Sequence, residues 1–271
     1  MSDIPSVIPT QNVMKEEFDW EVPIETVPVP SEGKVYPDSS PLHGKTTLQI
    51  KAMTAKEEDI LTSRALIQNG TVISHLIQAC LLDKGVDVRD MLLGDRNALM
   101  VSVRITGYGS DYTAESTCPE CMKRSEQNFS LSDLEIKRLD IDPVAPGQNL
   151  FEFVLPVTKK RVHFKFLTGN DEEERATALE RKKKLFPDLK VEGSVTSRLE
   201  QVIVSVDGKT DKNKINHFIK NMPAQDSRKL RSFITKSEPG IDMSAWMSCP
   251  HCGAESKVDL PVGSNFFWPS E

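Results

Sequence analysis

The sequence predicts an α+β protein with a mainly helical body, a β-hairpin and, in front of them, an extended proline-rich arm. Three observations predict this class. Apolar residues recur at helical spacing in several segments. Two neighbouring segments alternate polar and apolar residues, as half-buried strands do. Prolines gather near the N-terminus. With 271 residues, 38% of them hydrophobic and 27% charged, the chain is long enough to bury a core and has an ordinary globular composition.

The N-terminal segment is acidic and rich in proline. Residues 1–32 hold seven acidic residues against one lysine, a net charge of −6 that equals that of the whole chain. Seven of the 17 prolines lie in residues 1–43. Because proline fixes φ and removes a backbone donor, we expect an extended arm over residues 1–45. This arm is either a solvated tail or a segment that orders against a partner, and its apolar residues favour docking. The docking candidates are Phe18, Trp20, Ile24 and Val27.

The remainder of the chain carries no net charge. Residues 33–271 hold 33 basic and 33 acidic groups, which argues against wholesale binding to a phosphate backbone. No stretch approaches the roughly 18 apolar residues that a membrane-spanning helix needs. Residues 1–5 lack the basic start and apolar core of a secretory signal. We therefore expect a reducing cytoplasm, in which disulfides are rare.

An N-terminal helical domain is expected over residues 46–107. Thr54 and Glu57 form a capping-box pattern at the start of its first helix. Cys80 falls on the apolar face of the second helix, which makes it a small core residue. The expected elements are a helix from Thr54 to Gly70, a helix over residues 71–82, a short turn over residues 87–93 and a helix that Asp95 caps. Charged residues of these segments are candidates to pair across a buried helix contact, with Asp95 and Arg96 as internal groups: Glu57, Glu58, Asp59, Arg64, Asp95 and Arg96.

Residues 132–243 are expected to form an inserted α/β-hairpin domain. Phe151, Phe153 and Leu155 alternate with polar residues, which predicts a strand. The lysine run at residues 182–184 ends a helix that starts with glutamates, so the run complements the helix dipole and is a solvated helix end. The expected elements are strands over residues 149–157 and 161–167 and helices over residues 170–184, 195–206, 215–222 and 224–236.

Two Cys-Pro-x-Cys sequences form the candidate metal site of the chain. Each sequence is expected to form a turn between two short strands. The strands around the first turn are residues 112–117 and 125–131, and the strand after the second turn is residues 256–260. Two residues between cysteines let one tight turn present both sulfurs to a metal, and two such turns complete a tetrahedron with bonds of roughly 2.3 Å. The pairs are 127 residues apart. A split four-cysteine zinc ribbon, with halves at residues 108–131 and 244–271 and a domain inserted between them, explains this distance. The predicted ligands of one structural Zn²⁺ per chain are Cys118, Cys121, Cys249 and Cys252.

Three other interpretations of the cysteines compete with structural zinc. A redox dithiol at residues 249–252 needs its first cysteine at a helix N-terminus, whereas Gly253 and a strand follow. Structural disulfides need an oxidising compartment. A catalytic zinc keeps an open position, which four thiolates fill. His251 is interpreted as an exposed turn residue, and the sequence contains no catalytic constellation. Gly44-Lys45-Thr46 lacks the first glycine and the preceding strand of a phosphate-binding loop.

Several short motifs occur together along the chain. They lie at residues 33–37 (Gly-Lys-Val-Tyr-Pro), 53–61, 93–99, 107–109, 205–208, 238–240 and 266–269. By these motifs, over about residues 30–270, the chain resembles the baseplate hub subunit family of T-even-type tailed bacteriophages. The resemblance implies a non-enzymatic component of the baseplate hub, or a factor that helps to assemble it. The two cysteine pairs match a recurrent element of that family, which has no catalytic residues to carry over.

We therefore predict a structural component of a phage tail baseplate, located in the virion and assembled in the host cytoplasm. Its expected partners are other baseplate or tail proteins, such as hub, tube or wedge subunits, with no nucleic acid, membrane or small-molecule substrate. One alternative is an assembly chaperone that is absent from the mature particle. Another is a zinc-ribbon nucleic-acid adaptor, which is disfavoured because only Lys123, Arg124 and Lys257 lie near the cysteines.

Both ends of the chain are candidate docking segments. The C-terminal aromatic residues either dock to a partner or pack onto the chain's own core: Phe266, Phe267 and Trp268. At the other end, we expect deletion of residues 1–32 to leave folding and zinc binding intact and to weaken incorporation into the tail.

Overall fold

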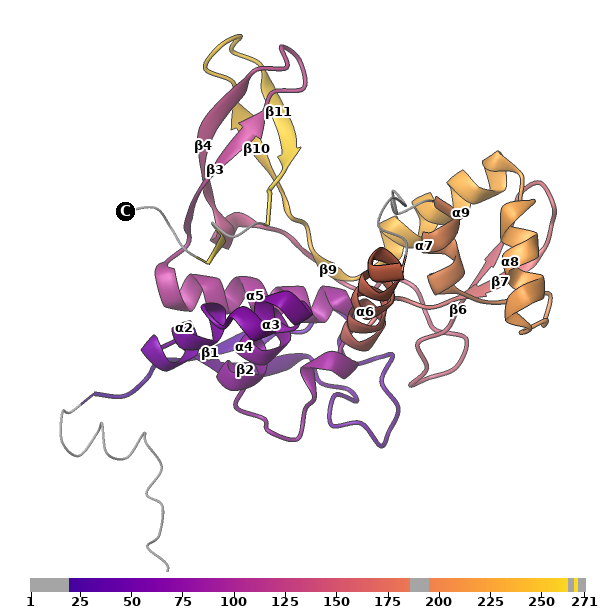
Figure 1. The fold of residues 1–271 in the computed structure, drawn as a ribbon, viewed down its shortest axis with the longest axis horizontal. Helices are drawn as coiled ribbons and strands as arrows, with labels where there is room; N and C mark the ends of the chain where they lie inside the picture. Colours follow the sequence, from indigo (N-terminus) through magenta and orange to yellow (C-terminus); the bar gives the residue numbers. More distant parts are fainter. Residues whose placement is uncertain (1–19, 186–194, 263–265, 268–271) are drawn as a thin grey trace, which may run out of the picture.

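The computed structural model describes residues 20–185, 195–262 and 266–267. It is a mixture of α-helices and small antiparallel sheets, in agreement with the predicted class. Figure 1 shows a helical body, a ribbon of β-strands that rises from it, and a lobe at one end of the long axis. The ribbon is built from segments that lie far apart in the sequence (Figure 1).

The helical body packs short helices and a two-stranded sheet around one long helix. Its elements are β1 (Ile24–Pro28), β2 (Thr47–Lys51), α2 (Ala55–Leu61), α3 (Arg64–Asn69), α4 (Val72–Cys80), the 3-10 helix η1 (Val88–Asp90) and α5 (Leu93–Tyr108). Helix α5 is the centre of the body, since both apolar and charged residues along it are buried. Cys80 is fully buried in the core, as predicted.

The start of the first helix follows the capping-box prediction, but its length does not. The backbone N–H and the hydroxyl of Thr54 both donate to the Glu57 carboxylate, at 3.1 and 2.6 Å. The expected single helix to Gly70 is wrong, because Ser63 has an extended backbone (ψ 106°) and separates α2 from α3. Gly70 ends α3 in the left-handed conformation, with φ +70°, a region that glycine enters without steric cost.

The beginning of the described chain belongs to the body. Strand β1 pairs with β2, and Val27 lies opposite Leu48 with 2% of its surface exposed. The prediction that Val27 docks to a partner is therefore wrong. Because β1 belongs to the folded body, we expect removal of residues 1–32 to impair folding, in contrast to the prediction made from the sequence. Trp20 and Ile24 are exposed, and Phe18 lies outside the described residues.

Asp95 is an internal group and does not cap α5. Its carboxylate accepts hydrogen bonds from the Ser31 backbone N–H and hydroxyl, at 2.8 and 2.5 Å, and from the Tyr36 hydroxyl at 2.6 Å. Burial raises the pKa of Asp95. These bonds fasten the loop after β1 to the long helix.

The charged groups of α2 and α5 were expected to pair with one another, but the structure gives them other partners. Glu57 pairs with Lys51 at 2.7 Å, and Glu58 accepts from the Tyr108 hydroxyl. Arg96 is buried and pairs with Glu172 of α6 (Gly169–Leu185). The ion pairs therefore link each helix to other segments of the fold.

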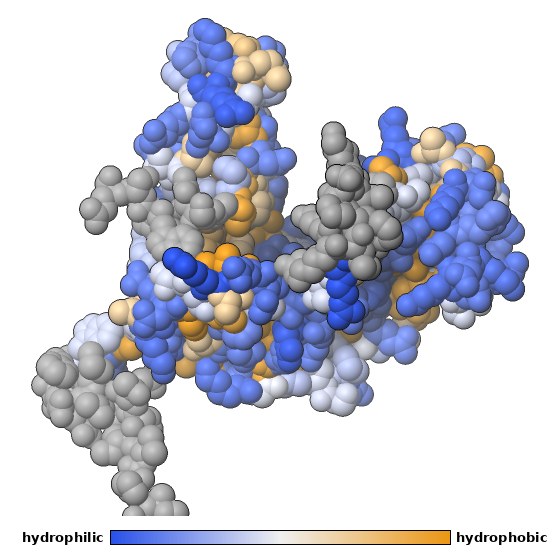
Figure 2. All heavy atoms as spheres, viewed as in Figure 1, coloured by the Kyte–Doolittle hydropathy of each residue, from blue (hydrophilic) through white to orange (hydrophobic). Residues whose placement is uncertain are grey.

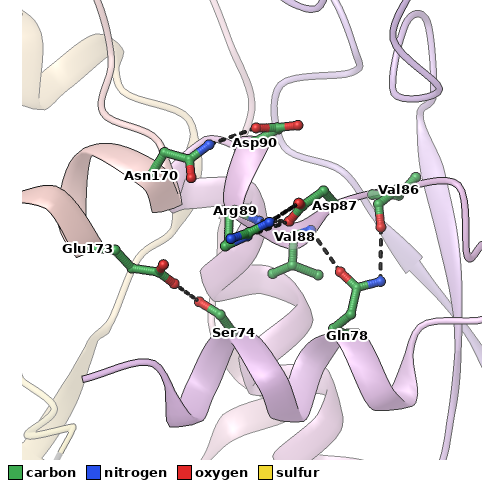
Figure 3. Close-up of polar contacts among 9 residues, drawn as sticks. All are labelled: Ser74, Gln78, Val86, Asp87, Val88, Arg89, Asp90, Asn170 and Glu173. Atoms are coloured by element: carbon green, nitrogen blue, oxygen red, sulfur yellow. Dashed lines mark hydrogen bonds and ion pairs between the residues drawn. The ribbon is translucent and has the colours of Figure 1, made fainter. Parts of the chain in front are cut away.

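Polar contacts hold α6 against α4 and η1 (Figure 3). Glu173 of α6 accepts from the Ser74 hydroxyl at 2.9 Å, and the Asn170 side chain donates to Asp90 at 2.7 Å. Gln78 bonds the backbone of the 86–88 segment with both ends of its amide, at 2.9 and 3.0 Å. A hollow of about 790 Å³ lies beside Ser74, Gln78 and Glu173.

The lobe consists of a three-stranded sheet and helices. Its strands are β6 (Phe151–Val154), β7 (Arg161–Phe164) and β8 (Ile203–Val206), and its helices are α7 (Val195–Val202), α8 (Lys212–Lys220) and α9 (Ala224–Ser237). The expected helix over residues 195–206 is corrected, since its last four residues form β8 and pair with β7. Four phenylalanines of the sheet region pack together with Phe233 of α9: Phe151, Phe153, Phe164 and Phe166.

The ribbon consists of two antiparallel hairpins. One joins β3 (Asp111–Thr117) to β4 (Arg124–Ser130), and the other joins β10 (Ser244–Ser248) to β11 (Glu255–Asp259). The 3-10 helix η2 (Leu131–Asp133) follows the first hairpin. Short strands β5 (Ile136–Lys137) and β9 (Gly240–Ile241) pair at the ribbon's base, where the chain leaves for the lobe and returns. This pairing brings the two hairpins together.

The C-terminal aromatic residues that the structure describes pack inward. Phe266 and Phe267 are 0% and 3% exposed, so the prediction that they dock to a partner is wrong and the self-packing alternative holds for them. Trp268 lies outside the described residues. The buried Arg104 donates from Nε to the Phe266 carbonyl at 2.5 Å, which ties this segment to α5.

Candidate metal centre

The two Cys-Pro-x-Cys turns have the same backbone geometry. In the first, the Met122 N–H donates to the Cys118 carbonyl at 2.9 Å, and in the second the Gly253 N–H donates to the Cys249 carbonyl at 2.8 Å. The residue after the second cysteine is left-handed in both turns, with φ +58° at Met122 and +72° at Gly253. Each turn therefore presents its two cysteines in the same way.

The ribbon brings all four predicted ligands together. The Sγ atoms of Cys118 and Cys252 are 3.7 Å apart, and those of Cys121 and Cys249 are also 3.7 Å apart. All four sulfurs lie within 4.8 Å of one another. Within the described part of the chain the cysteines form no disulfide. Cys80 lies in the helical core and is not part of this cluster.

The spacing of the sulfurs fits a tetrahedral metal. Bonds of roughly 2.3 Å from four sulfurs to a central Zn²⁺ place neighbouring sulfurs about 3.8 Å apart. Cys118 and Cys249 are buried, whereas Cys252 is exposed at the outer side of the cluster. His251 lies at the surface with Nε2 3.3 Å from the Arg124 carbonyl, in agreement with its interpretation as a turn residue.

The thiols differ in their tendency to ionise. Burial disfavours the thiolate of Cys249, but backbone N–H groups of the turn and neighbouring thiols outweigh this effect and lower its pKa. The Ala254 N–H favours the thiolate of Cys252, yet desolvation and the nearby sulfurs raise its pKa. Four thiolates at this spacing repel one another strongly, so their joint ionisation requires a cation between them.

The basic residues near the cluster do not form a continuous patch. Lys257 pairs with Asp242 at 2.7 Å, and Arg124 lies 3.9 Å from Glu115. Acidic groups therefore lie beside two of the three basic residues on which a nucleic-acid adaptor would depend.

A model of a known protein family matches nearly the whole chain. A family model described as T4 bacteriophage base plate protein matches residues 24–268, which include both cysteine pairs, the helical body and the lobe. The chain belongs to this family. Comparison with curated proteins found no match, and comparison with solved structures found none either.

Family membership confirms the resemblance to T4-type phage baseplate proteins. It indicates a structural role for this baseplate protein in the tail of the virion, in contact with other tail proteins. None of the helices in the described ranges is both long and apolar enough to cross a bilayer.

Sequence reasoning missed a groove on the lobe, lined by Lys160, Lys209 and Lys214. The lysines between residues 209 and 220 are the sequence signal that points to it.

Proposed function

We propose that this baseplate protein is a non-enzymatic structural subunit of the hub region, which docks to neighbouring tail proteins. The family match over residues 24–268 carries the proposal. The motifs that resemble hub subunits support it, because three of them meet at one junction. The hydroxyl of Tyr36, in the motif at residues 33–37, donates to Asp95, in the motif at residues 93–99. Gly94 of the same motif lies against Pro239, in the motif at residues 238–240. These motifs thus serve the packing of the fold, as expected for a protein whose task is to hold a shape.

The proposed centre of the ribbon is one structural Zn²⁺ held by Cys118, Cys121, Cys249 and Cys252. The sulfur spacing of 3.7 Å supports this assignment, and four thiolates leave no open position for a substrate. When bound, the ion offsets half of the negative charge of the four thiolates and ties the two hairpins together. It replaces a hydrophobic core that two short hairpins of this size cannot build.

Zinc analysis of matched variants tests this site. We expect about one zinc per purified chain, and loss of it in Cys121→Ser, because three thiolates bind Zn²⁺ more weakly than four. Cys80→Ala is the control, since it removes a cysteine that lies in the core and not in the cluster. Inductively coupled plasma mass spectrometry measures the metal. A fully folded wild-type chain without metal would contradict the assignment.

Quantification of the protein in purified particles tests the role in the hub. A stoichiometric amount in the tail, located in the hub by electron microscopy, supports the structural subunit. Expression during infection combined with absence from particles supports the assembly chaperone and contradicts the proposal. Salt-dependent DNA binding at micromolar concentration supports the nucleic-acid adaptor.

A further inference from the structure

A groove on the lobe combines an apolar floor with a basic rim. It has a volume of about 430 Å³, within the range of roughly 300–1,000 Å³ typical of ligand pockets. Val206, Ile215 and the half-buried Phe218 line its floor. Its rim carries Lys160, Lys209 and Lys214. Such a groove accepts an aromatic side chain that is flanked by acidic residues.

Most of the positive charge on this rim is free for a partner. Lys160 pairs with Asp207 at 2.7 Å. Lys209 and Lys214 are exposed and form no ion pair with any residue that the structure describes. Figure 2 shows that hydrophilic residues dominate the surface at this end of the molecule. The groove therefore has a net positive potential.

The chain itself contains a segment of the complementary chemistry. Residues 16–20 read Glu-Glu-Phe-Asp-Trp, with three carboxylates around two aromatic rings. They stand immediately before the body, where Trp20 is 45% exposed and Ile24 begins β1. The described chain starts at one end of the long axis, and α8, which forms one wall of the groove, lies at the other end (Figure 1).

We propose that residues 16–20 of one copy dock into the groove between β8 and α8 of a second copy. The carboxylates of Glu16, Glu17 and Asp19 face Lys209 and Lys214, while an aromatic ring covers the floor. Because the described chain begins at one end of the molecule and the groove lies at the other, such a contact is head-to-tail. Contacts of this kind form rings when the rotation between copies closes. The inference does not depend on the position of the protein in the hub.

Charge-reversal variants of the full-length chain test the contact. We expect wild-type protein to self-associate with increasing concentration in sedimentation velocity at low salt. Both Lys209→Glu/Lys214→Glu and Glu16→Lys/Glu17→Lys should weaken this association about tenfold, since each variant sets like charges against each other. The combined four-residue variant should restore it. Lys56→Glu/Lys229→Glu is the control, because it changes the net charge equally at exposed lysines outside the groove.

Carbodiimide cross-linking identifies the occupant, because this reagent joins carboxylates directly to amines. In a mixture of isotopically light and heavy protein, links from Glu16 or Glu17 to Lys209 or Lys214 should join one light and one heavy chain. Links confined to single chains would overturn the proposal in favour of an arm that folds back. A wild-type chain that stays monomeric at every concentration, or a combined variant that does not recover, would overturn it as well.

Discussion

A single buried carboxylate joins two elements of the lobe. Asp226 lies in the first turn of α9 with no exposed surface, and it accepts hydrogen bonds from three donors in the β6–β7 connection. The donors are the Val157 N–H (2.7 Å), the Thr158 N–H (3.0 Å) and the Thr158 hydroxyl (2.8 Å). Burial opposes the charged form, but these donors outweigh it and lower the pKa of Asp226.

We expect Asp226→Asn to destabilise the protein by about 1–3 kcal/mol at pH 7, because an amide cannot accept all three bonds. The wild-type carboxylate has a lower pKa in the folded state than in the unfolded state, so its contribution is present above about pH 4 and decreases as the pH falls further. The difference in unfolding free energy between wild type and variant should therefore narrow at acidic pH. Urea unfolding at a series of pH values measures this.

Asp59→Asn is the matched control for this prediction, since Asp59 is an exposed helical aspartate. It should leave the unfolding free energy within about 0.5 kcal/mol of the wild type at each pH. An Asp226→Asn variant that is as stable as the wild type at pH 7 would contradict the role assigned to the carboxylate.

At the scale of elements, α5 and the segment before β9 approach each other closely at Gly94. A Cβ atom on Gly94 would come within 1.7 Å of the Pro239 carbonyl oxygen and 3.0 Å of the Gly240 Cα. Only glycine allows this contact, which sets the ribbon's base against the central helix. The contact therefore determines where the chain returns from the lobe to the ribbon.

We expect Gly94→Ala to destabilise the protein by about 1–3 kcal/mol, because the added methyl group must push one backbone away from the other. Thermal unfolding measures the loss. Gly85→Ala is the control, since its Cβ would meet only the Asp83 side chain, at 3.3 Å. Equal effects of the two substitutions would show that the close contact does not constrain the fold.

The elements also show what the sequence can and cannot reveal. The capping box at Thr54, the strands β3 and β4 and the helix α9 carry local signals, and the structure confirms them. The local sequence of β8 wrongly indicates a helix, because Ile203 and Val206 continue the apolar spacing of α7. Pairing with β7 decides its conformation, and this contact is not visible in the local sequence.

Strand β1 was also not predicted, because its pairing with β2 is not visible in the local sequence. The prolines indicated an extended arm, whereas β1 forms a two-stranded sheet with β2. Among the described residues β1 is an edge strand, and an edge strand tolerates proline where no backbone donor is needed. The bonds from Ser31 and Tyr36 to Asp95 span about 60 residues and have no sequence signature. For the candidate metal centre, the cysteine spacing predicts the two turns, whereas the pairing of β5 with β9, which brings the two distant hairpins together, has no sequence signal.

At the scale of the whole molecule, the boundary between arm and body lies within the acidic segment. We expect deletion of residues 1–19 to preserve the fold and the metal content and to abolish self-association. Deletion of residues 1–28 should lower the melting temperature markedly, because it removes β1 and exposes the surface that Val27 covers. Circular dichroism, zinc analysis and sedimentation compare the two truncations. Equal stability of both would place the boundary after β1.

The ribbon joins residues that are synthesised at very different times. Cys118 and Cys121 leave the ribosome long before Cys249 and Cys252, and Arg104 waits still longer for the Phe266 carbonyl. Until then the first hairpin carries only two of the four cysteines of the proposed metal site, and the buried guanidinium of Arg104 lacks one of its acceptors. The Arg104 contact can therefore form only after residue 266 has been translated, and we expect a chain that ends before this residue to be more open to proteolysis than the complete one.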